Sequence, residues 1–300
     1  MSKQRNSVIE SLGVYLPPKK VSSGDILKTC KRALRYPLAR LTGIKQRRMA
    51  GDTEFAIDLA RNAVAMALDR SKYDAEDIEL MICCNISRYD GPGFQFSFEP
   101  GTAVRLRDHS QMPNAICFDI SNACAGMFTG TYIADAFLQA GLVRNAIVVS
   151  GEYITHLTRT AQFEIAHERD ERLACLTLGD SGAASIMELG PDDSVGFHDI
   201  DMYTLGAYAD CCIAKPTDSE AGGAIMVTDS LRIHTVAIRE SVKHMVGVLR
   251  QRGMPVDDLK HFLMHQTARS AISETAKQLN EFYRKKVFDS TNTIYNVEER

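Results

Sequence analysis

The sequence lacks the features of several large protein classes. No apolar run approaches the roughly 18 residues that a membrane-spanning helix requires, which predicts a chain without a membrane span. The formal net charge of −3 over 300 residues provides no basic field and predicts no nucleic-acid partner. With 45% hydrophobic residues, the chain can bury a large core, in one domain or in two closely packed halves.

The eight cysteines are not spaced like a metal site or a disulfide framework. CxxC spacing is absent, and the adjacent pairs at 83–84 and 211–212 would point to opposite faces of a strand, where they make poor chelates. No stretch typical of a signal peptide opens the sequence. These features predict reduced thiols, a cytoplasmic location and no metal.

One stretch combines a strand, a helix cap and a cysteine. Residues 115–120 predict a buried strand, residues 121–122 (Ser-Asn) offer N-cap chemistry, and residues 124–140 follow a helix pattern closed by Gly141. Cys124 is therefore expected at a helix N-terminus, where unpaired N–H groups favour a thiolate and can face an oxyanion. This arrangement is typical of a nucleophilic cysteine for acyl transfer, whereas the commoner role of a cysteine is that of a small buried packing residue.

Two other segments are candidates for substrate contacts. Residues 40–48 form a basic loop that includes Arg40 and Arg47 and is either simply solvated or meets the phosphates of a coenzyme A or phosphopantetheine carrier. Residues 87–100 predict a long aromatic loop that lines an acyl tunnel, seals a subunit interface or does both.

A Gly-Pro-Asp-Asp break at residues 190–193 predicts the boundary between two halves, residues 1–190 and residues 191–300. Both halves contain a helix, a short linker, an aspartate and an apolar strand, which in the second half spans 258–265. Such a faint long-period repeat indicates domain duplication. It places His265 at the C-terminal end of a strand, where open α/β sheets hold their ligands, although a lone histidine there is more often structural. A Cys–His pair contributed by two halves is one way to run thioester chemistry.

Four motifs, in order along the chain, resemble those of a known family. They are Thr-Gly-Ile at 42–44 followed by Arg47, Asp-x-Ser-x-Ala-Cys-Ala-Gly at 119–126, Gly-Asp-Ser-Gly-Ala-Ala at 179–184, and His-Gln at 265–266. Together they resemble the β-ketoacyl-ACP synthase III branch of the thiolase superfamily. The resemblance implies an α/β thiolase fold, five-layered αβαβα from two duplicated halves, usually as a homodimer.

The resemblance also implies an acyltransferase that joins two acyl thioesters by Claisen condensation. Cys124 would be acylated, its backbone N–H would help to form an oxyanion hole, and His265 would stabilise the enolate nucleophile. Acyl-CoA or an acyl carrier protein would be the substrate, with Arg40 and Arg47 as carrier contacts and no further cofactor. Such chemistry belongs to fatty acid, lipid or polyketide biosynthesis in the cytoplasm.

Some positions depart from the family pattern. The family completes its triad with an asparagine in a Gly-Asn motif, whereas Asn292 and Asn296 lack the preceding glycine, and the sequence ends near where that motif belongs. We therefore expect a chain truncated at its C-terminal end. Leu41 stands where the family usually has arginine, with Arg40 one residue earlier. Because the chain has no tryptophan, the residue that stacks on adenine in the family is absent, and Tyr36 is the nearest substitute.

Residues 98–103 (Phe-Glu-Pro-Gly-Thr-Ala) resemble the Leu-Glu-Pro-Ala-Thr-Ala segment of head-to-head condensing enzymes of olefin biosynthesis. Enzymes that join β-ketoacyl chains into resorcinols or pyrones also fit. In the olefin enzymes this glutamate reaches the partner subunit's site and helps to deprotonate the α-carbon. The resemblance implies that role for Glu99, because a condensation without loss of CO₂ needs a base. Alternatively, Glu99 is an acid that suits the start of the next helix.

The sequence thus predicts a condensing acyltransferase with Cys124, His265 and Glu99 as catalytic residues. Two alternatives stay open: acyl transfer to an oxygen or nitrogen nucleophile, and a catalytically silent partner subunit.

Overall fold

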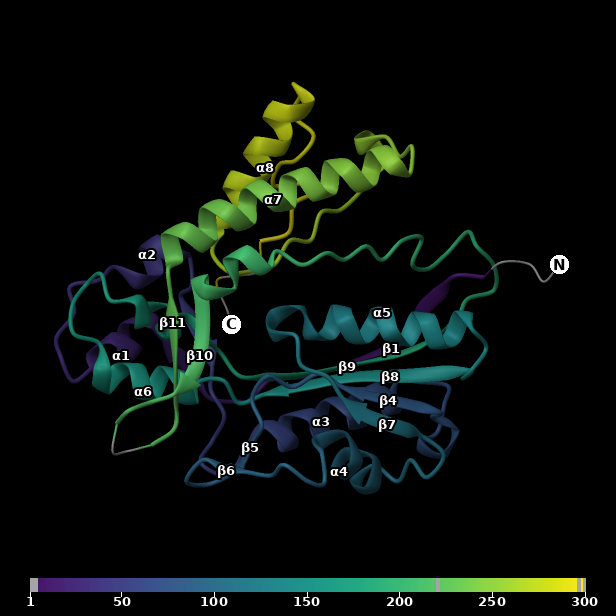
Figure 1. Cartoon of the computed structure of the whole chain (residues 1–300), viewed down its shortest axis with the longest axis horizontal. Helices are drawn as coiled ribbons and strands as arrows, with labels where there is room; N and C mark the ends of the chain where they lie inside the picture. The colour runs from purple at the N-terminus through teal and green to yellow at the C-terminus, as the bar shows by residue number, and fades with distance from the viewer. Residues whose placement is uncertain (1–4, 220–221, 296–297, 299–300) are drawn as a thin grey trace. The chain divides into compact units, whose positions relative to one another are not determined.

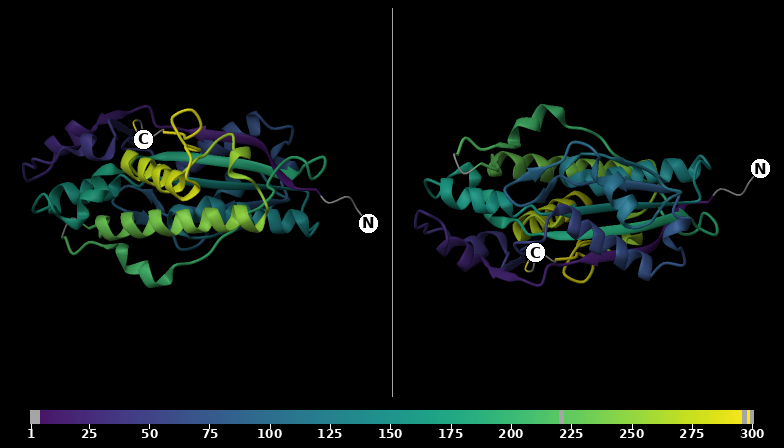
Figure 2. Two further views of the ribbon diagram at one scale, coloured as in Figure 1. Left: turned by 90° about the horizontal axis from the view of Figure 1, so that it is seen from above. Right: turned by 90° about the horizontal axis from the view of Figure 1, so that it is seen from below.

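The structure is a computed structural model that describes residues 5–219, 222–295 and 298. Asn296, considered above for the third catalytic position, lies outside the described residues. The chain forms two compact units whose segments alternate in the sequence (Figures 1 and 2). The first unit comprises residues up to 19, 48–155 and 179–200, and the second comprises 20–47, 156–178 and residues from 201 onward. The predicted division by duplication at residues 190/191 stays a prediction.

The first unit is built on a five-stranded sheet in the order β1-β9-β8-β4-β7. Its strands are β1 (Ser7–Tyr15), β4 (Leu80–Cys83), β7 (Ile116–Asp119), β8 (Asn145–Glu152) and β9 (Ser181–Leu189). β4 runs parallel to both β7 and β8, whereas β9 runs antiparallel to β8 and β1. The carboxyl ends of β4, β7 and β8 therefore meet at one edge of the sheet.

Helices cover both faces of this sheet (Figure 1). α3 (Ala56–Asp69) and α4 (Thr102–His109) pack on one face, and α5 (Gly126–Gln139) packs on the other. Along β4, Met81 and Cys83 join the core under α3, while Leu80 and Ile82 join the core under α5. This alternation buries the strand on both faces, which agrees with its unbroken apolar sequence.

The strand before Cys124 differs from its prediction. β7 forms within the expected residues, but it is the last strand of the sheet and pairs with β4 alone among the described strands. Ile116 is consequently 57% exposed rather than buried. An apolar run predicts a strand, but it does not specify whether the strand is central or at an edge.

The second unit consists mainly of helices and two-stranded sheets. Two helices, α7 (Ser230–Gln251) and α8 (Arg269–Tyr283), share a core formed by apolar side chains such as Leu249 and Leu279. The other elements are β2 (Lys20–Ser22), α1 (Ser23–Lys28), α2 (Leu38–Thr42), β3 (Gln46–Arg48), α6 (His156–Glu164), β10 (Cys212–Pro216) and β11 (Ala224–Thr228). Short 3-10 turns span Ala75–Asp77 (η1) in the first unit and Glu171–Thr177 (η3), Gly206–Cys211 (η4) and Val256–Asp258 (η5) in the second.

The apolar strand predicted at residues 258–265 is not formed. Among the described residues, this segment pairs only at Phe262, which forms an isolated parallel bridge with Thr293. The exposure of residues 261–267 nevertheless alternates with a period of two. The segment therefore has an extended backbone without a neighbouring sheet to pair with.

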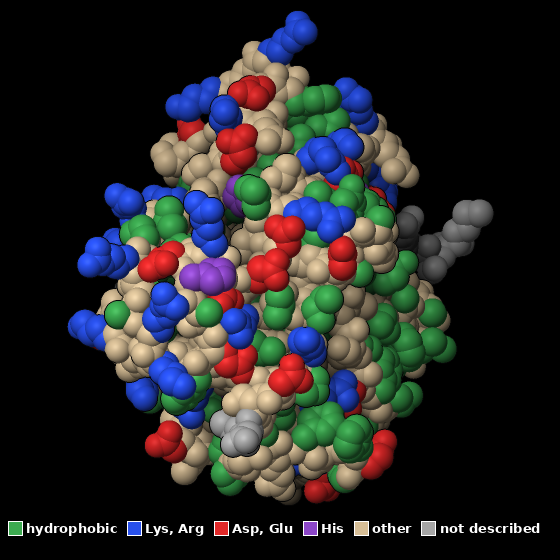
Figure 3. Space-filling view, turned by 60° about the vertical axis from the view of Figure 1, so that its left-hand side comes forward, with side chains coloured by type: hydrophobic (Ala, Val, Ile, Leu, Met, Phe, Trp, Pro, Cys, Tyr) green, Lys and Arg blue, Asp and Glu red, His purple; other side chains and the backbone are tan. Residues whose placement is uncertain are grey.

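Surface charge and hydrophobicity are mixed. On the face drawn in Figure 3, Lys and Arg side chains occur together with Asp and Glu side chains, and apolar side chains lie between them. Within the described part of the chain, no helix has the length and apolar character needed to span a membrane.

A small hairpin, β5 (Tyr89–Gly91) and β6 (Gln95–Phe96), occupies the middle of the predicted aromatic loop. Its rings contact one another, with centroids 5.3 Å apart for Tyr89 and Phe94 and 4.7 Å apart for Phe96 and Phe98. Phe98 is 82% exposed. The aromatic side chains therefore cluster at the surface of the first unit.

Candidate active site

A polar residue follows or ends each of the three parallel strands at their shared edge. Asn85 follows β4, Asp119 ends β7, and Glu152 ends β8. Because ligands of open α/β sheets bind beyond the carboxyl ends of the strands, this edge is the candidate site of the first unit. Cys124 follows β7 at the same edge.

Cys124 lies in a tight turn between β7 and α5. The turn is a 3-10 turn, η2 (Ala123–Ala125), and α5 begins only at Gly126, two residues later than the helix predicted from the sequence. Asn122 precedes η2 but does not cap it with its side chain; its Nδ2 instead donates to Thr129 Oγ1 at 2.7 Å. The Ser-Asn pattern therefore predicted the turn at Cys124 correctly, but the predicted side-chain cap by Asn122 is not formed.

The backbone before Cys124 is strained. Ala123 has φ = +43°, a conformation that L-residues other than glycine rarely adopt. Such a conformation costs about 1–3 kcal/mol and is concentrated at functional sites, because the surrounding structure must hold it in place. Cys124 is exposed at this strained turn.

The first turns of α5 sit close against the sheet because two glycines face it. A Cβ at Gly126 would lie 2.9 Å from the Cys84 carbonyl oxygen, and a Cβ at Gly130 would lie 2.7 Å from Cys84 Sγ. Both glycines are on the buried stripe of α5 together with Ala134 and Leu138. The position of the Cys124 turn thus depends on the absence of two side chains.

The environments of the eight described cysteines separate them into two groups. Cys124 and Cys212 are exposed, and the other six are buried or half-buried. Burial raises the pKa of Cys84 and of Cys175 to about 12, and it also raises the pKa of Cys83 well above its usual value. Because the thiolate is the nucleophile, these buried thiols are unreactive at neutral pH.

Asp119 connects the strand before Cys124 to the segment that carries Glu99. Its carboxylate accepts a hydrogen bond from the backbone N–H of Ala103 at 3.2 Å, in the first turn of α4. Glu99 is exposed and lies two residues before Gly101, the N-cap of α4, whose first turn contains no acidic residue. Glu99 therefore lies outside the helical turn in which an acid would stabilise the helix dipole.

The remaining predicted site residues belong to the second unit. His265 is exposed and precedes α8, whose N-cap is Ala268. Gln266 Nε2 donates to the carbonyl oxygens of Met264 at 2.8 Å and of Ile294 at 3.1 Å, which fixes the chain next to His265. Cys124 and Glu99 are in one compact unit and His265 is in the other.

The two predicted carrier contacts have different surroundings. Arg40 is exposed on α2, whereas Arg47 is fully buried. Arg47 Nη2 donates to Ser23 Oγ at 3.0 Å, and Ser23 Oγ donates to the Ile44 carbonyl oxygen at 2.6 Å. Arg47 thus holds the start of α1 against the segment that follows α2.

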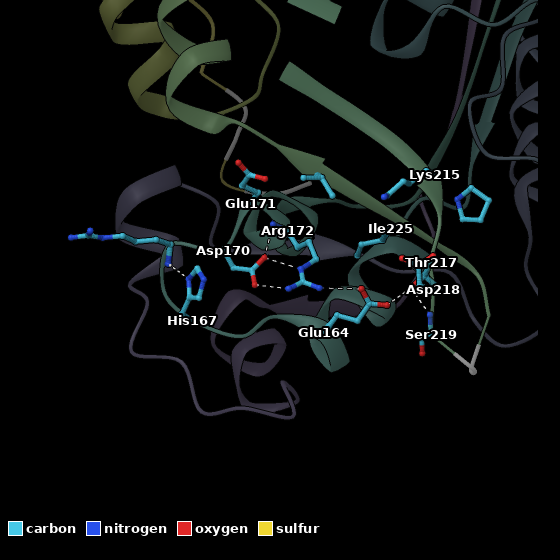
Figure 4. A pocket seen from close by; sticks show the side chains of 13 residues that line it. Glu164, His167, Asp170, Glu171, Arg172, Lys215, Thr217, Asp218, Ser219 and Ile225 are labelled. Atoms are coloured by element: carbon cyan, nitrogen blue, oxygen red, sulfur yellow. Dashed lines mark hydrogen bonds and ion pairs between the residues drawn. The ribbon is translucent and has the colours of Figure 1, made fainter. Parts of the chain in front are cut away.

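The second unit also contains a pocket of about 750 Å³ that the sequence did not predict (Figure 4). In it Arg172 donates to Asp170 through Nε and Nη2, both at 2.8 Å, and to Glu164 through Nη1 at 3.2 Å. Desolvation opposes ionisation of Asp170, but its hydrogen bonds, led by those from Arg172, hold its pKa well below the usual range. The charged stretch at residues 167–172 was the only sequence signal of this pocket.

The charge of this pocket argues against a phosphate site. Its lining contains four carboxylates, Glu164, Asp170, Glu171 and Asp218, against three cations, Arg169, Arg172 and Lys215. A phosphate would meet a net negative lining.

Comparison with known proteins identifies the relationship. Residues 118–206, which include Cys124, match the model of the 3-oxoacyl-[acyl-carrier-protein] synthase III family. The chain is 26% identical over 269 residues to the β-ketoacyl-[acyl-carrier-protein] synthase III of Sulfurimonas denitrificans, covering 87% of this chain and 76% of that protein. The corresponding Clostridium kluyveri protein is 27% identical over 288 residues, covering 92% and 82%. The chain is thus similar to β-ketoacyl-ACP synthase III proteins over most of its length.

Solved structures support the same fold. A crystal structure of OleA from Xanthomonas campestris matches 100% of this chain and 86% of that chain, with a TM-score of 0.76 and 22% identity. The synthase III (FabH) of Pseudomonas aeruginosa matches 98% of this chain and 84% of that chain, with a TM-score of 0.78 and 22% identity. The predicted α/β thiolase-like fold is therefore confirmed over the whole chain, and the two similar scores favour neither the synthase III branch nor the OleA branch.

The close packing of α5 against the sheet gives a testable prediction about stability. Gly130→Ala places a Cβ 2.6 Å from Val148 Cγ1 and 2.7 Å from Cys84 Sγ, so we expect it to lower the free energy of unfolding by about 1–3 kcal/mol. Gly247→Ala is the matched control: Gly247 is also inside a helix, α7, but a Cβ there meets nothing within 4 Å. The control should stabilise by up to about 1 kcal/mol. Urea unfolding measures both, and equal effects of the two substitutions would contradict the packing described.

Proposed function

We propose that this protein is an acyl-thioester condensing enzyme that forms a C–C bond through an acyl-Cys124 intermediate. The observation that carries the proposal is the exposed Cys124 on a strained turn at the carboxyl ends of three parallel strands. A thiol at this place can attack an acyl thioester, releasing the carrier thiol and leaving the acyl group on Sγ. The family match at residues 118–206 covers this segment.

The remaining catalytic roles belong to the same proposal. His265 would stabilise the enolate of the second thioester, and Glu99 would remove the α-proton when no CO₂ is lost. The carbanion would then attack the acyl carbonyl, and the C–S bond to Cys124 would break, freeing the thiolate. The five-layered arrangement of two duplicated halves, residues 1–190 and 191–300, is part of this proposal.

Acyl-CoA or an acyl carrier protein is the proposed donor. The relatives are named β-ketoacyl-[acyl-carrier-protein] synthase III, and one structural neighbour, an OleA variant, contains bound lauric acid and lauroyl-CoA. Arg40 is an exposed cation that suits a phosphate of the carrier, whereas the contact of Arg47 with Ser23 favours a structural role for that residue. A cytoplasmic location in lipid or polyketide biosynthesis stays a prediction.

Product analysis tests the reaction. Purified protein is incubated with lauroyl-CoA, alone and together with a malonyl thioester, and all products are identified by mass spectrometry. A β-ketoacyl or longer C–C bonded product supports the proposal. Transfer of lauroyl to an oxygen or nitrogen nucleophile favours the alternative acyltransferase, and an unchanged substrate contradicts both.

Glu99 should affect only the condensation step. Glu99→Gln removes the base, so we expect condensation of two lauroyl-CoA molecules to fall by at least about 100-fold while acylation of the enzyme stays within about twofold. Glu76→Gln, at another exposed glutamate of the first unit, serves as the control. Rapid-quench measurement separates the two steps. Equal losses in both steps would indicate that Glu99 is structural.

A homodimer is also proposed, with the edge of β7 as its contact surface. Among the described strands, β7 is paired along one edge only. Phe128 of α5, the helix that follows β7 in the chain, is 71% exposed. An exposed apolar edge strand is a template for pairing with a second copy.

Ile116→Lys tests this contact. A charge at the edge should convert the dimer into a monomer, whereas Leu142→Lys, at another exposed apolar residue of the first unit, should leave the dimer intact. Light scattering after size-exclusion chromatography measures the mass. A monomeric wild type, or an unchanged mass of the Ile116→Lys variant, would refute the proposed interface.

A further inference from the structure

Glu152 makes contacts that the proposed chemistry does not use. Its carboxylate accepts hydrogen bonds from the backbone N–H groups of Ile86 at 2.6 Å and Ser87 at 2.9 Å. The Ser150 hydroxyl donates to the same carboxylate at 2.9 Å. Ser87 Oγ donates in turn to the carbonyl oxygen of Tyr153 at 2.9 Å. The turn after β4 is thus fastened to the end of β8.

Asn85, in the segment after β4, makes the corresponding contact with the backbone of β8. It is 1% exposed, and its Oδ1 accepts from the backbone N–H of Gly151 at 2.8 Å and from Cys83 Sγ at 3.2 Å. Its Nδ2 is buried and has no hydrogen-bond partner among the described residues. Asn85 and Glu152 therefore continue the β4–β8 pairing through side chains, beyond the point where the backbone ladder ends.

Of these two side chains, Glu152 acts on Cys84, which belongs to the core under α5, whereas Asn85 contacts Cys83 of the core under α3. Cys84, two residues before Ile86, forms the floor on which Gly126 and Gly130 rest. The carbonyl oxygen of Cys83 accepts from the backbone N–H of Ile120 at 2.8 Å, which joins the end of β4 to the strand before Cys124. A displacement of the Ile86–Ser87 turn would consequently move the floor of the Cys124 turn.

The charge state of Glu152 matters for these contacts. An ionised carboxylate only accepts hydrogen bonds, so it can serve both backbone N–H groups and the Ser150 hydroxyl at once, whereas the amide of a glutamine would turn a donor toward one of them. Desolvation raises the pKa of Glu152 to about 7, Asp180 adds to the rise, and the three hydrogen bonds oppose it. Besides Asp180 before β9, Cys84 after β4 also faces Glu152.

The raised pKa of Glu152 determines how its contribution to stability changes with pH. Because the folded-state pKa lies above the ordinary value of 4.5, the contribution of Glu152 to stability is greatest below about pH 4.5 and is lost as the pH rises through about 7. The folded protein is therefore less stable when Glu152 is ionised than when Glu152 is protonated. The ionised form is nevertheless the one that holds the Ile86–Ser87 turn.

We propose that Glu152 is a positioning residue for Cys124: it holds the Ile86–Ser87 turn, and through Cys84 the first turn of α5, in the arrangement in which the Cys124 thiol reacts. The inference rests on the proposed role of Cys124 as the nucleophile. Glu152 itself touches neither substrate nor reacting atom in this role.

The test measures the reactivity of the thiol rather than turnover. The rate of alkylation by iodoacetamide at Cys124 is divided by the rate at Cys212, the other exposed cysteine, using peptide mass spectrometry. The ratio is compared for the wild type, Glu152→Gln and Glu79→Gln from about pH 6 to about pH 8.5. Glu79 is the matched control, because its carboxylate accepts the backbone N–H of Arg144 at 2.7 Å next to the opposite end of β4.

We expect Glu152→Gln to lower the ratio about tenfold at about pH 8, and Glu79→Gln to leave it within about twofold, because small misplacements of reacting groups have large effects on rate. In the wild type the ratio should fall as the pH drops through about 7, and this fall should be absent in Glu152→Gln. A ratio for Glu152→Gln within about twofold of wild type at every pH would overturn the inference.

Two further measurements keep the outcomes separable. If Glu152→Gln fails to fold by circular dichroism, Glu152→Asp is used, which keeps the charge but shortens the reach; it should retain the pH dependence at a lower ratio, and a wild-type ratio would refute the role. Acylation by lauroyl-CoA is measured in parallel. If the wild type is not acylated but shows the expected alkylation pattern, the proposed function is contradicted and the positioning role is kept. If wild type and Glu152→Gln are acylated equally, the positioning role is contradicted and the proposed function is kept.

Discussion

The arrangement around Cys124 depends on the parallel pairing of β4 with its two neighbours. Because β7, β4 and β8 run in the same direction, the chain segments that leave them emerge at one edge of the sheet. Backbone groups there no longer have ladder partners, and buried backbone groups must be satisfied in another way. Asn85 and Glu152 supply those partners through their side chains, and Asp119 does the same for the first turn of α4. The polar cluster at the site is thus a consequence of ending three parallel strands together.

The same edge explains why Cys124 is accessible while Cys83 and Cys84 are inert. Cys83 and Cys84 belong to the strand core, where burial holds them as thiols. Cys124 is kept at the surface because the glycine face of α5 brings the helix onto Cys84 while the strained Ala123 turns the chain outward. Backbone strain and close packing thereby fix the position of the Cys124 turn.

Much of this could be predicted from the sequence, but the rest depends on strand order. The long apolar or amphipathic patterns of α3, β4, β8 and α7 are those that a sequence shows most clearly. The pattern before Cys124 predicted a strand and a turn correctly, but not that β7 is an edge strand or that α5 begins at Gly126. Partners that lie in other strands, such as Asn85 for Gly151, could not be found, because no local pattern specifies which strands are neighbours. A polar residue at the end of each apolar strand was the available signal.

The central claim is that Cys124 is the residue that accepts an acyl group. The most direct measurement is intact-protein mass spectrometry after mixing the chain with acyl-CoAs of increasing chain length, followed by peptide mapping. The account predicts one acyl mass on Cys124, none on Cys212, and no adduct in Cys124→Ala. An adduct that maps to another cysteine, or that persists in Cys124→Ala, would contradict it.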